Sequence, residues 1–210
     1  TYCSNSYVRE LYGDKGNWRR EKSPERIVRE LELFRDLYGL DAIGFVDEVM
    51  LTSVNRLESF RDLYASKIGV PFFFMERPEN MTSEKVRLIK QAGAQMVSIG
   101  IESGDENLRR NLLNRRHSQQ TIISAFQVAK ENGLTTHAFT MVGFPNEDRQ
   151  SIRESFKLLK EARPDTVQTS TFYPLRGTKL WEVSVAQGLF NPETCMPARY
   201  YGESSLNYPQ

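Results

Sequence analysis

The sequence predicts an α/β fold built on a parallel sheet. Helical and strand-like segments alternate from about residue 23 to residue 173, which is the pattern of repeated βα units. The strand-like segments are short continuous apolar runs, as expected for strands that are buried on both faces. A βα unit returns about every 25 to 40 residues, and this spacing suits either a barrel or a doubly wound sheet. Periodicity alone leaves both architectures open.

The first predicted helix runs from Ser23 to Gly39. It opens with a serine N-cap followed by proline at the first helical position, and a glycine ends it. The apolar run 42–46 then predicts the first strand, and this strand leads directly into the acids Asp47 and Glu48.

The later segments repeat this order of helix and strand, with glycine again ending two of the helices. The segment from Tyr7 to Arg20 precedes this regular part, and we expect it to be a solvated loop. The expected elements are a helix over 54–68, a strand over 70–75, a helix over 82–92, a strand over 95–101, helical segments near 108–113 and over 119–132, a strand over 136–142, a helix over 149–162, a strand over 166–172 and a short helix over 178–186.

Composition sets limits on the location and partners of the chain. The 210 residues are enough for one sizeable core, and 28 basic against 27 acidic residues leave no electrostatic signal for a nucleic-acid or membrane-surface partner. No apolar run reaches the roughly 18 residues of a membrane span. The two cysteines, Cys3 and Cys195, lie at opposite ends, which argues against a disulfide scaffold. We therefore expect a cytoplasmic protein with no membrane span and no nucleic-acid partner.

Polar residues follow five successive predicted strands. In parallel α/β folds the carboxyl ends of the strands face one crevice, so these residues are expected to meet there. A single acid at such a position commonly does no more than end a strand, but five successive polar ends indicate a site. The five segments are Asp47-Glu48, Glu76-Arg77, 102–104, 143–147 and 173–178.

Five sequence segments together resemble a known family. The segment 1–6, Thr-Tyr-Cys-Ser-Asn-Ser, resembles the last third of a C-x3-C-x-aromatic-C loop, and 98–104 reads Ser-Ile-Gly-Ile-Glu-Ser-Gly. The other three segments are 45–48 (Phe-Val-Asp-Glu), 143–147 (Gly-Phe-Pro-Asn-Glu) and 172–178 (Phe-Tyr-Pro-Leu-Arg-Gly-Thr). Along the chain, all five segments stand in the order of the family. The set resembles the radical S-adenosylmethionine (radical SAM) enzymes, especially those with a cobalamin-binding domain upstream. Asn146 and Arg176 depart mildly from the family pattern, which has glycine and proline there.

The resemblance implies a partial (βα)6-type TIM barrel that lacks its first strand. It places the core at 1–188 and an irregular tail at 189–210. It also implies a 4Fe-4S cluster with Cys3 as one ligand, cleavage of S-adenosylmethionine (SAM) to a 5′-deoxyadenosyl radical that abstracts a substrate hydrogen, a small-molecule substrate, and an electron donor such as flavodoxin or ferredoxin. Cobalamin in the full-length protein would assist methyl transfer or rearrangement. The other two cysteines of the loop would lie upstream of residue 1, so we expect this fragment to be inactive.

The resemblance also assigns site residues. SAM brings an ammonium, a carboxylate, a ribose diol and an adenine, so its site needs an acid, a cation and hydroxyl acceptors. The implied assignments are Asp47 and Glu48 for the ammonium, Glu102 for the ribose, Ser98 for the sugar or carboxylate, Arg115 or Arg116 for the carboxylate, and the backbone from Met141 to Gly143 for adenine.

Two other readings stay open at this point. One is a TIM-barrel hydrolase or lyase that uses Asp47, Glu102 and Glu147 as acid, base or divalent-metal ligands. The other is a non-catalytic α/β binding module in which these acids only end strands. His117 and His137 are isolated in the sequence and are expected to be structural.

Overall fold

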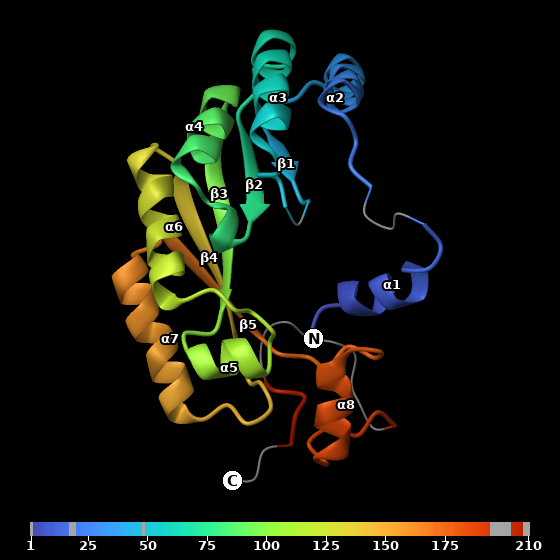
Figure 1. Cartoon of the computed structure of the whole chain (residues 1–210), viewed down its shortest axis with the longest axis vertical. Coiled ribbons are helices and arrows are strands. Elements are labelled where there is room, and N and C mark those ends of the chain that lie inside the picture. The colour runs from blue at the N-terminus through green and yellow to red at the C-terminus, as the bar shows by residue number, and fades with distance from the viewer. Residues whose placement is uncertain (1, 17–19, 48, 194–202, 208–210) are drawn as a thin grey trace.

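The sheet has five parallel strands in sequential order (Figure 1). In the computed structural model of the protein, the residues described are 2–16, 20–47, 49–193 and 203–207. The strands are β1 (Ile43–Phe45), β2 (Phe72–Glu76), β3 (Ala94–Glu102), β4 (Thr135–Val142) and β5 (Thr166–Thr171).

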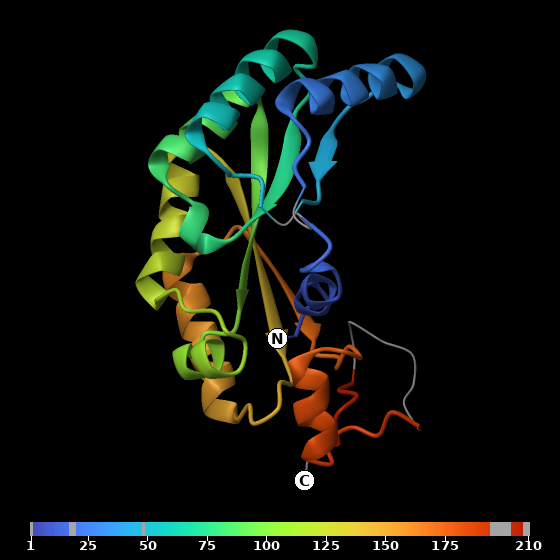
Figure 2. The same cartoon turned by 45° about the vertical axis from the view of Figure 1, so that its right-hand side comes forward.

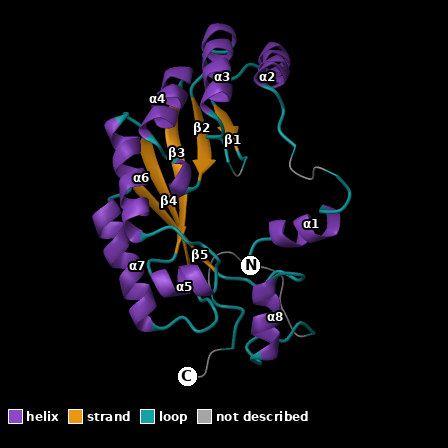
Figure 3. Cartoon of the chain, viewed as in Figure 1, coloured by secondary structure: helices purple, strands orange, loops and turns teal. Residues whose placement is uncertain are grey.

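Helices cover one face of this sheet. α4, α6 and α7 lie along that face, whereas α1 lies on the other side of the strands (Figures 1 and 2). Figure 3 shows the alternation of strand and helix that the sequence predicts. The helices are α1 (Asn5–Tyr12), α2 (Pro24–Tyr38), α3 (Val54–Lys67), the 3-10 turn η1 (Pro78–Asn80), α4 (Ser83–Ala92), α5 (Glu106–Asn111), α6 (Gln119–Glu131), α7 (Arg149–Ala162) and α8 (Lys179–Ala186).

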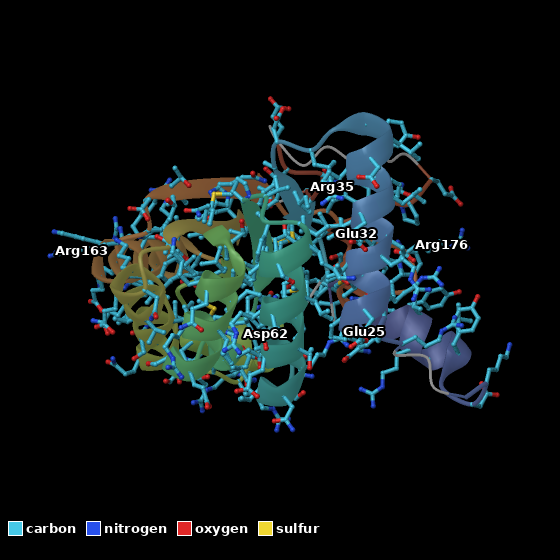
Figure 4. The ribbon with its side chains drawn as sticks, turned by 90° about the horizontal axis from the view of Figure 1, so that it is seen from above. Glu25, Glu32, Arg35, Asp62, Arg163 and Arg176 are labelled. Carbon is cyan, nitrogen blue, oxygen red and sulfur yellow. The ribbon has the colours of Figure 1, made fainter. Side chains whose placement is uncertain are left out.

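The core lies between the sheet and its helices. Phe72 and Phe74 alternate with the more exposed Phe73 along β2, so their rings point into the helix layer, where Phe72 meets Tyr64 of α3 edge-on. At the periphery, α2 lies beside α3. Figure 4 shows this pair from above, with Glu32 and Arg35 labelled on α2 and Asp62 on α3. The buried apolar face therefore holds the strands together and leaves their carboxyl ends for polar residues.

The predicted gathering of strand ends at one edge is confirmed. All neighbouring strands are parallel, so Asp47, Arg77, Glu102 and Gly143, which end or follow β1 to β4, lie at the same edge of the sheet. In Figure 1 the strands point toward the end of the molecule that carries α1, α5 and α8. The fold is thus the predicted partial barrel, with the candidate site at its carboxyl edge.

The first helix is a difference from the prediction. Residues 7–12, part of the segment from Tyr7 to Arg20 expected to be a loop, belong to α1 (Asn5–Tyr12), although its N-cap Ser4 makes no capping hydrogen bond. Its apolar residues recur at helical spacing, but Tyr7 and Tyr12 remain 42% and 51% exposed, so the helix buries little surface. The sequence signal was the spacing of these residues without a cap, which is a weak signal for so short a helix.

Part of the tail packs back on the core. Leu206 is buried in a second apolar cluster with Phe190, and the N–H of Asn207 donates to the carbonyl of Leu189 at 2.7 Å. Within the described residues, no helix has the length and apolar character needed to cross a bilayer.

Candidate functional site

A cavity of about 380 Å³ lies at the carboxyl edge of the sheet. Its walls come from the beginning of the chain, from β2, β3 and β4, and from the loop between α5 and α6. It brings together three of the predicted site residues, Cys3, Ser98 and Arg115, which are far apart in the sequence. Its volume lies within the range of small-molecule sites, about 300–1,000 Å³.

Glu102 lies at the edge of this cavity, where its side chain contacts Arg115, one of the lining residues. Nη2 of Arg115 lies 2.9 Å from Oε1 of Glu102, and the two side chains are 15% and 10% exposed. Nη1 of Arg115 also donates to the carbonyl of Gly100 at 3.1 Å. Burial alone lowers the pKa of Arg115, but the charge of Glu102 and the contact with Tyr2 raise it above its ordinary value. The guanidinium therefore stays charged beside the carboxylate.

An irregular strand end aims Glu102 at the arginine. The pairing of β3 with β4 shifts register between Gly100 and Glu102, and Glu102 has a left-handed φ of +67°. The N–H of Ser103 closes a three-residue turn on the carbonyl of Ile101 at 3.0 Å. A β-bulge of this kind redirects a side chain, and strained backbone of this kind collects at functional sites.

Gly100 gives the carboxylate its room. A Cβ at Gly100 would lie 2.8 Å from Oε1 of Glu102 and 3.5 Å from Nη2 of Arg115. Because real Cβ atoms do not approach so closely, any larger residue would displace the carboxylate. The glycine in Gly-Ile-Glu-Ser is therefore part of the site.

Tyr2 is a site residue that sequence reasoning missed. Its hydroxyl accepts hydrogen bonds from Nη2 and Nε of Arg115 at 2.7 and 3.1 Å, and its ring meets Phe144 edge-on at 6.4 Å. Burial, with the charge of Glu102, raises the pKa of Tyr2 well above its ordinary value, so the phenol stays neutral. Tyr2, the residue next to Cys3, thus anchors the start of the chain to Arg115 and to Phe144, which follows β4. The aromatic position before the cysteine was the signal for it.

A donor count shows what Arg115 has left to offer. A guanidinium has five N–H donors. In the described part of the chain, two bonds go to Tyr2, one to Glu102 and one to Gly100. One N–H on Nη1 therefore remains, and a ligand can accept a hydrogen bond from it while the other four hydrogen bonds stay in place.

The structure separates Arg116 from Arg115. Arg116 lines a different cavity of about 550 Å³, together with Arg77 and His117. Arg115 is therefore the predicted cation that pairs with Glu102 and lines the cavity of Cys3.

The predicted ammonium ligands lie apart from this cavity. Asp47 lines a third cavity, of about 320 Å³, which it shares with Arg56 and Phe45. Glu48 lies outside the described residues. Asp47 therefore shares the sheet edge with Glu102 but not the cavity.

The turn after β4 is held by its own acid. Gly143 has φ +86°, and its N–H and that of Phe144 donate to Oε2 of Glu147 at 2.5 and 3.3 Å. A Cβ at Gly143 would lie 3.6 Å from Oγ of Ser204, which is an ordinary van der Waals contact with the tail. Met141 and Gly143 line none of the three cavities just described.

The residues around Cys3 fit SAM by their chemistry. Glu102 is an acceptor for hydroxyls, Arg115 is a cation for a carboxylate, and Ser98 is a hydroxyl that can donate or accept. Cys3 is a free thiol of intermediate exposure at the same cavity. The described residues thus include one cysteine, the residue type that ligates iron in a 4Fe-4S cluster, and a polar set whose chemistry matches that of SAM.

Comparisons with known proteins agree with this chemistry. The family model described as the radical SAM superfamily matches residues 1–159. An uncharacterized methyltransferase of Pyrococcus horikoshii is 26% identical over 189 residues, covering 90% of this chain and 40% of that protein. The cytidylyl-2-hydroxyethylphosphonate methyltransferase of Streptomyces wedmorensis is 23% identical over 219 residues, covering 100% and 39%.

A solved structure shares the fold. The radical S-adenosylmethionine methyltransferase TsrM from Kitasatospora setae, with cobalamin and a [4Fe-4S] cluster bound, matches with a TM-score of 0.61 at 14% identity, over 72% of this chain and 31% of that chain. The chain spans about two fifths of the length of the two methyltransferases above. The resemblance noted in the sequence is confirmed by the family match, and the chain belongs to the radical SAM superfamily.

Proposed function

We propose that this chain is the SAM-binding core of a radical SAM enzyme that acts on a small molecule. The observation that carries the proposal is the convergence of Cys3, Ser98 and Arg115 on one cavity, with Glu102 ion-paired to the arginine at its edge. A hydrolase with strand-end acids does not require a cysteine at that place, and a plain binding module requires neither the buried ion pair nor the strained strand end.

Each residue has a proposed task toward SAM. Glu102 accepts the ribose hydroxyls, the remaining N–H of Arg115 binds the carboxylate, and Ser98 contacts the sugar or carboxylate. Cys3 is a thiolate ligand of a 4Fe-4S cluster. When bound and reduced, the cluster supplies the electron that cleaves SAM to methionine and a 5′-deoxyadenosyl radical. The chain orients SAM and excludes water around it.

The remaining assignments rest on position. Asp47 follows β1, at the same edge of the sheet as Glu102, and we keep it as an ammonium ligand. Glu48 lies outside the described residues, and its assignment to the ammonium stays a prediction from the sequence. The backbone from Met141 to Gly143 follows the neighbouring strand β4, and we keep it for adenine.

The reaction class is proposed from the relatives. The two curated relatives are named as methyltransferases, and the TsrM structure holds cobalamin. We therefore propose methyl transfer, or a rearrangement, assisted by cobalamin in the whole protein, with a cytoplasmic flavodoxin or ferredoxin as electron donor.

The test uses a chain that carries two further cysteines ahead of Cys3 in the C-x3-C-x-aromatic-C spacing. After anaerobic loading with iron and sulfide we expect about four irons per chain. Dithionite and SAM should then give 5′-deoxyadenosine, or S-adenosylhomocysteine if a methyl group is transferred. Cys3→Ser should lose the iron, whereas the matched variant Cys195→Ser should keep it. Equal iron in the two variants would contradict the proposal.

A further inference from the structure

A second cavity adjoins the one that holds Cys3. It has a volume of about 550 Å³ and is lined by Arg77, Glu79, Asn114, Arg116, His117 and Thr121. Arg77 and Asn114 also line the cavity of Cys3, so the two spaces share a wall. The second space is therefore adjacent to the cavity of Cys3.

The charges around this cavity are unbalanced. Nη2 of Arg77 lies 2.7 Å from Oε1 of Glu79, so this carboxylate already has a cation. Burial acts to raise the pKa of Glu79, but contact with His117 and the charge of Arg77 outweigh it and hold the pKa at about 2. Arg116, by contrast, makes no ion pair or hydrogen bond with any other residue that the structure describes. The cavity thus carries a net positive charge.

His117 is a buried polar side chain without a hydrogen bond. Its side chain is only 3% exposed, and neither Nδ1 nor Nε2 has a hydrogen-bond partner among the described residues. Nδ1 lies 3.3 Å from Oε2 of Glu79, which is an ion-pair distance without the angles of a hydrogen bond. Because a buried polar group without a partner is unfavourable, a ligand that accepts a hydrogen bond from this ring would stabilise it.

The start of α6 adds to the positive potential. His117 directly precedes the N-cap Ser118, and Thr121 lies in the first turn of the 13-residue helix. The amino end of a helix favours negative charge. Arg116, His117 and Thr121 of the first turn of α6 thus all line one cavity.

We propose that Arg77, Arg116 and His117 form an oxyanion site for a phosphate or carboxylate group of the substrate. Arg116 offers two parallel N–H donors, and the imidazole of His117 offers a third. Arg77 lies at the boundary of the two cavities and orients the rest of the molecule toward Cys3. The assignment to the substrate rests on the proposed function, whereas the oxyanion site itself rests on this cavity alone.

The test uses the chain as it is, with histidines labelled with ¹⁵N, titrated with inorganic phosphate or with acetate at constant ionic strength. We expect a saturable shift of the His117 ring signals with at least one anion, while the His137 signals stay unchanged. The anion that binds with the higher affinity shows whether the site prefers a phosphate or a carboxylate group. Arg116→Gln should weaken binding about fivefold or more, because it removes the free charge.

The matched control is Arg29→Gln, which changes an exposed arginine of α2 and should leave the titration unchanged. Absence of a saturable His117 shift, or equal affinity in the chain and in Arg116→Gln, would overturn the site. Since neither iron nor SAM is present, this failure would leave the proposed function untouched, and failure of the iron test would leave the oxyanion site standing.

Discussion

Oε1 of Glu102 and Nη2 of Arg115 lie 2.9 Å apart, and this pair joins the end of β3 to the loop that precedes α6. Both side chains are mostly buried, so the charge of each compensates for the cost of burying the charge of the other. The pair is held by the bulge at Gly100 on one side and by Tyr2 on the other. Changes at these two supports should therefore alter the site more than the fold.

Gly100→Ala tests the first support. Gly100 does not have a left-handed φ, so alanine suits the strand, but its methyl would lie 2.8 Å from Oε1 of Glu102. The carboxylate must move while the backbone need not. We expect unfolding free energy within about 1 kcal/mol of the unchanged chain and a several-fold weaker affinity for SAM. Urea unfolding and calorimetric titration measure the two quantities in the loop-completed chain, that is, the chain with two added cysteines ahead of Cys3. Unchanged affinity would contradict the role of Gly100.

Tyr2→Phe tests the second support. The change keeps the ring against Phe144 but removes both hydrogen bonds to Arg115. Bonds to charged groups contribute about 1.5–3 kcal/mol, so the segment with Cys3 should open about tenfold more often or more. In a Cys195→Ser background the labelling rate of Cys3 by a thiol reagent reports this opening. Tyr12→Phe, at a half-exposed tyrosine of α1, is the matched control and should label at the original rate.

Glu76→Gln tests a buried carboxylate at the end of β2. Glu76 is 3% exposed and accepts from the N–H groups of Leu51 and Arg77 at 2.6 and 2.8 Å and from the amide of Asn80 at 2.8 Å. A glutamine would turn an NH₂ toward these donors. We expect the free energy of unfolding to fall by about 1.5–3 kcal/mol, against almost no change for the exposed Glu58→Gln. Equal urea midpoints for the two variants would refute this account of Glu76.

Glu79 gives a prediction for the pH dependence of stability. Its pKa falls from 4.5 to about 2 on folding, so the folded chain holds the carboxylate charged where the unfolded chain would protonate it. This contribution is complete above pH 4.5 and is lost as the pH falls toward 2. Glu79→Gln should therefore be less stable at pH 7, and its deficit should shrink below pH 4.5. Urea unfolding across this range checks it, and a constant deficit would show that Glu79 does not titrate as described.

The elements of the fold were largely predictable because their signals are local. The start of α2 at Ser23-Pro24 and its end at Gly39 follow from capping chemistry, and β3 differs from the expected 95–101 by one residue at each end. Hydrophobic runs and caps act over a few residues, so the sequence carries them directly.

The arrangement of the site was only partly predictable. Glu102 could be placed at a strand end, but the bond between Tyr2 and Arg115 joins residues 113 apart. Such contacts depend on the completed fold, as does the placing of Arg115 and Arg116 in different cavities. His117 was expected to be structural, and the sequence does not show that its buried ring nitrogens have no hydrogen-bond partner among the described residues.

Glu102→Gln, made in the loop-completed chain, tests the central claim most directly. Glutamine keeps the side-chain shape and an acceptor for Arg115 but removes the charge, and it avoids leaving the arginine without any partner. Calorimetric titration with SAM should show an affinity at least about tenfold weaker, since hydrogen bonds to a charged group contribute about 1.5–3 kcal/mol. Iron content should be unchanged, and Glu106→Gln, at an acid paired with Arg110 on α5, should bind SAM as the unchanged chain does. Equal affinity of the Glu102→Gln and unchanged chains would contradict the assignment of this carboxylate to SAM.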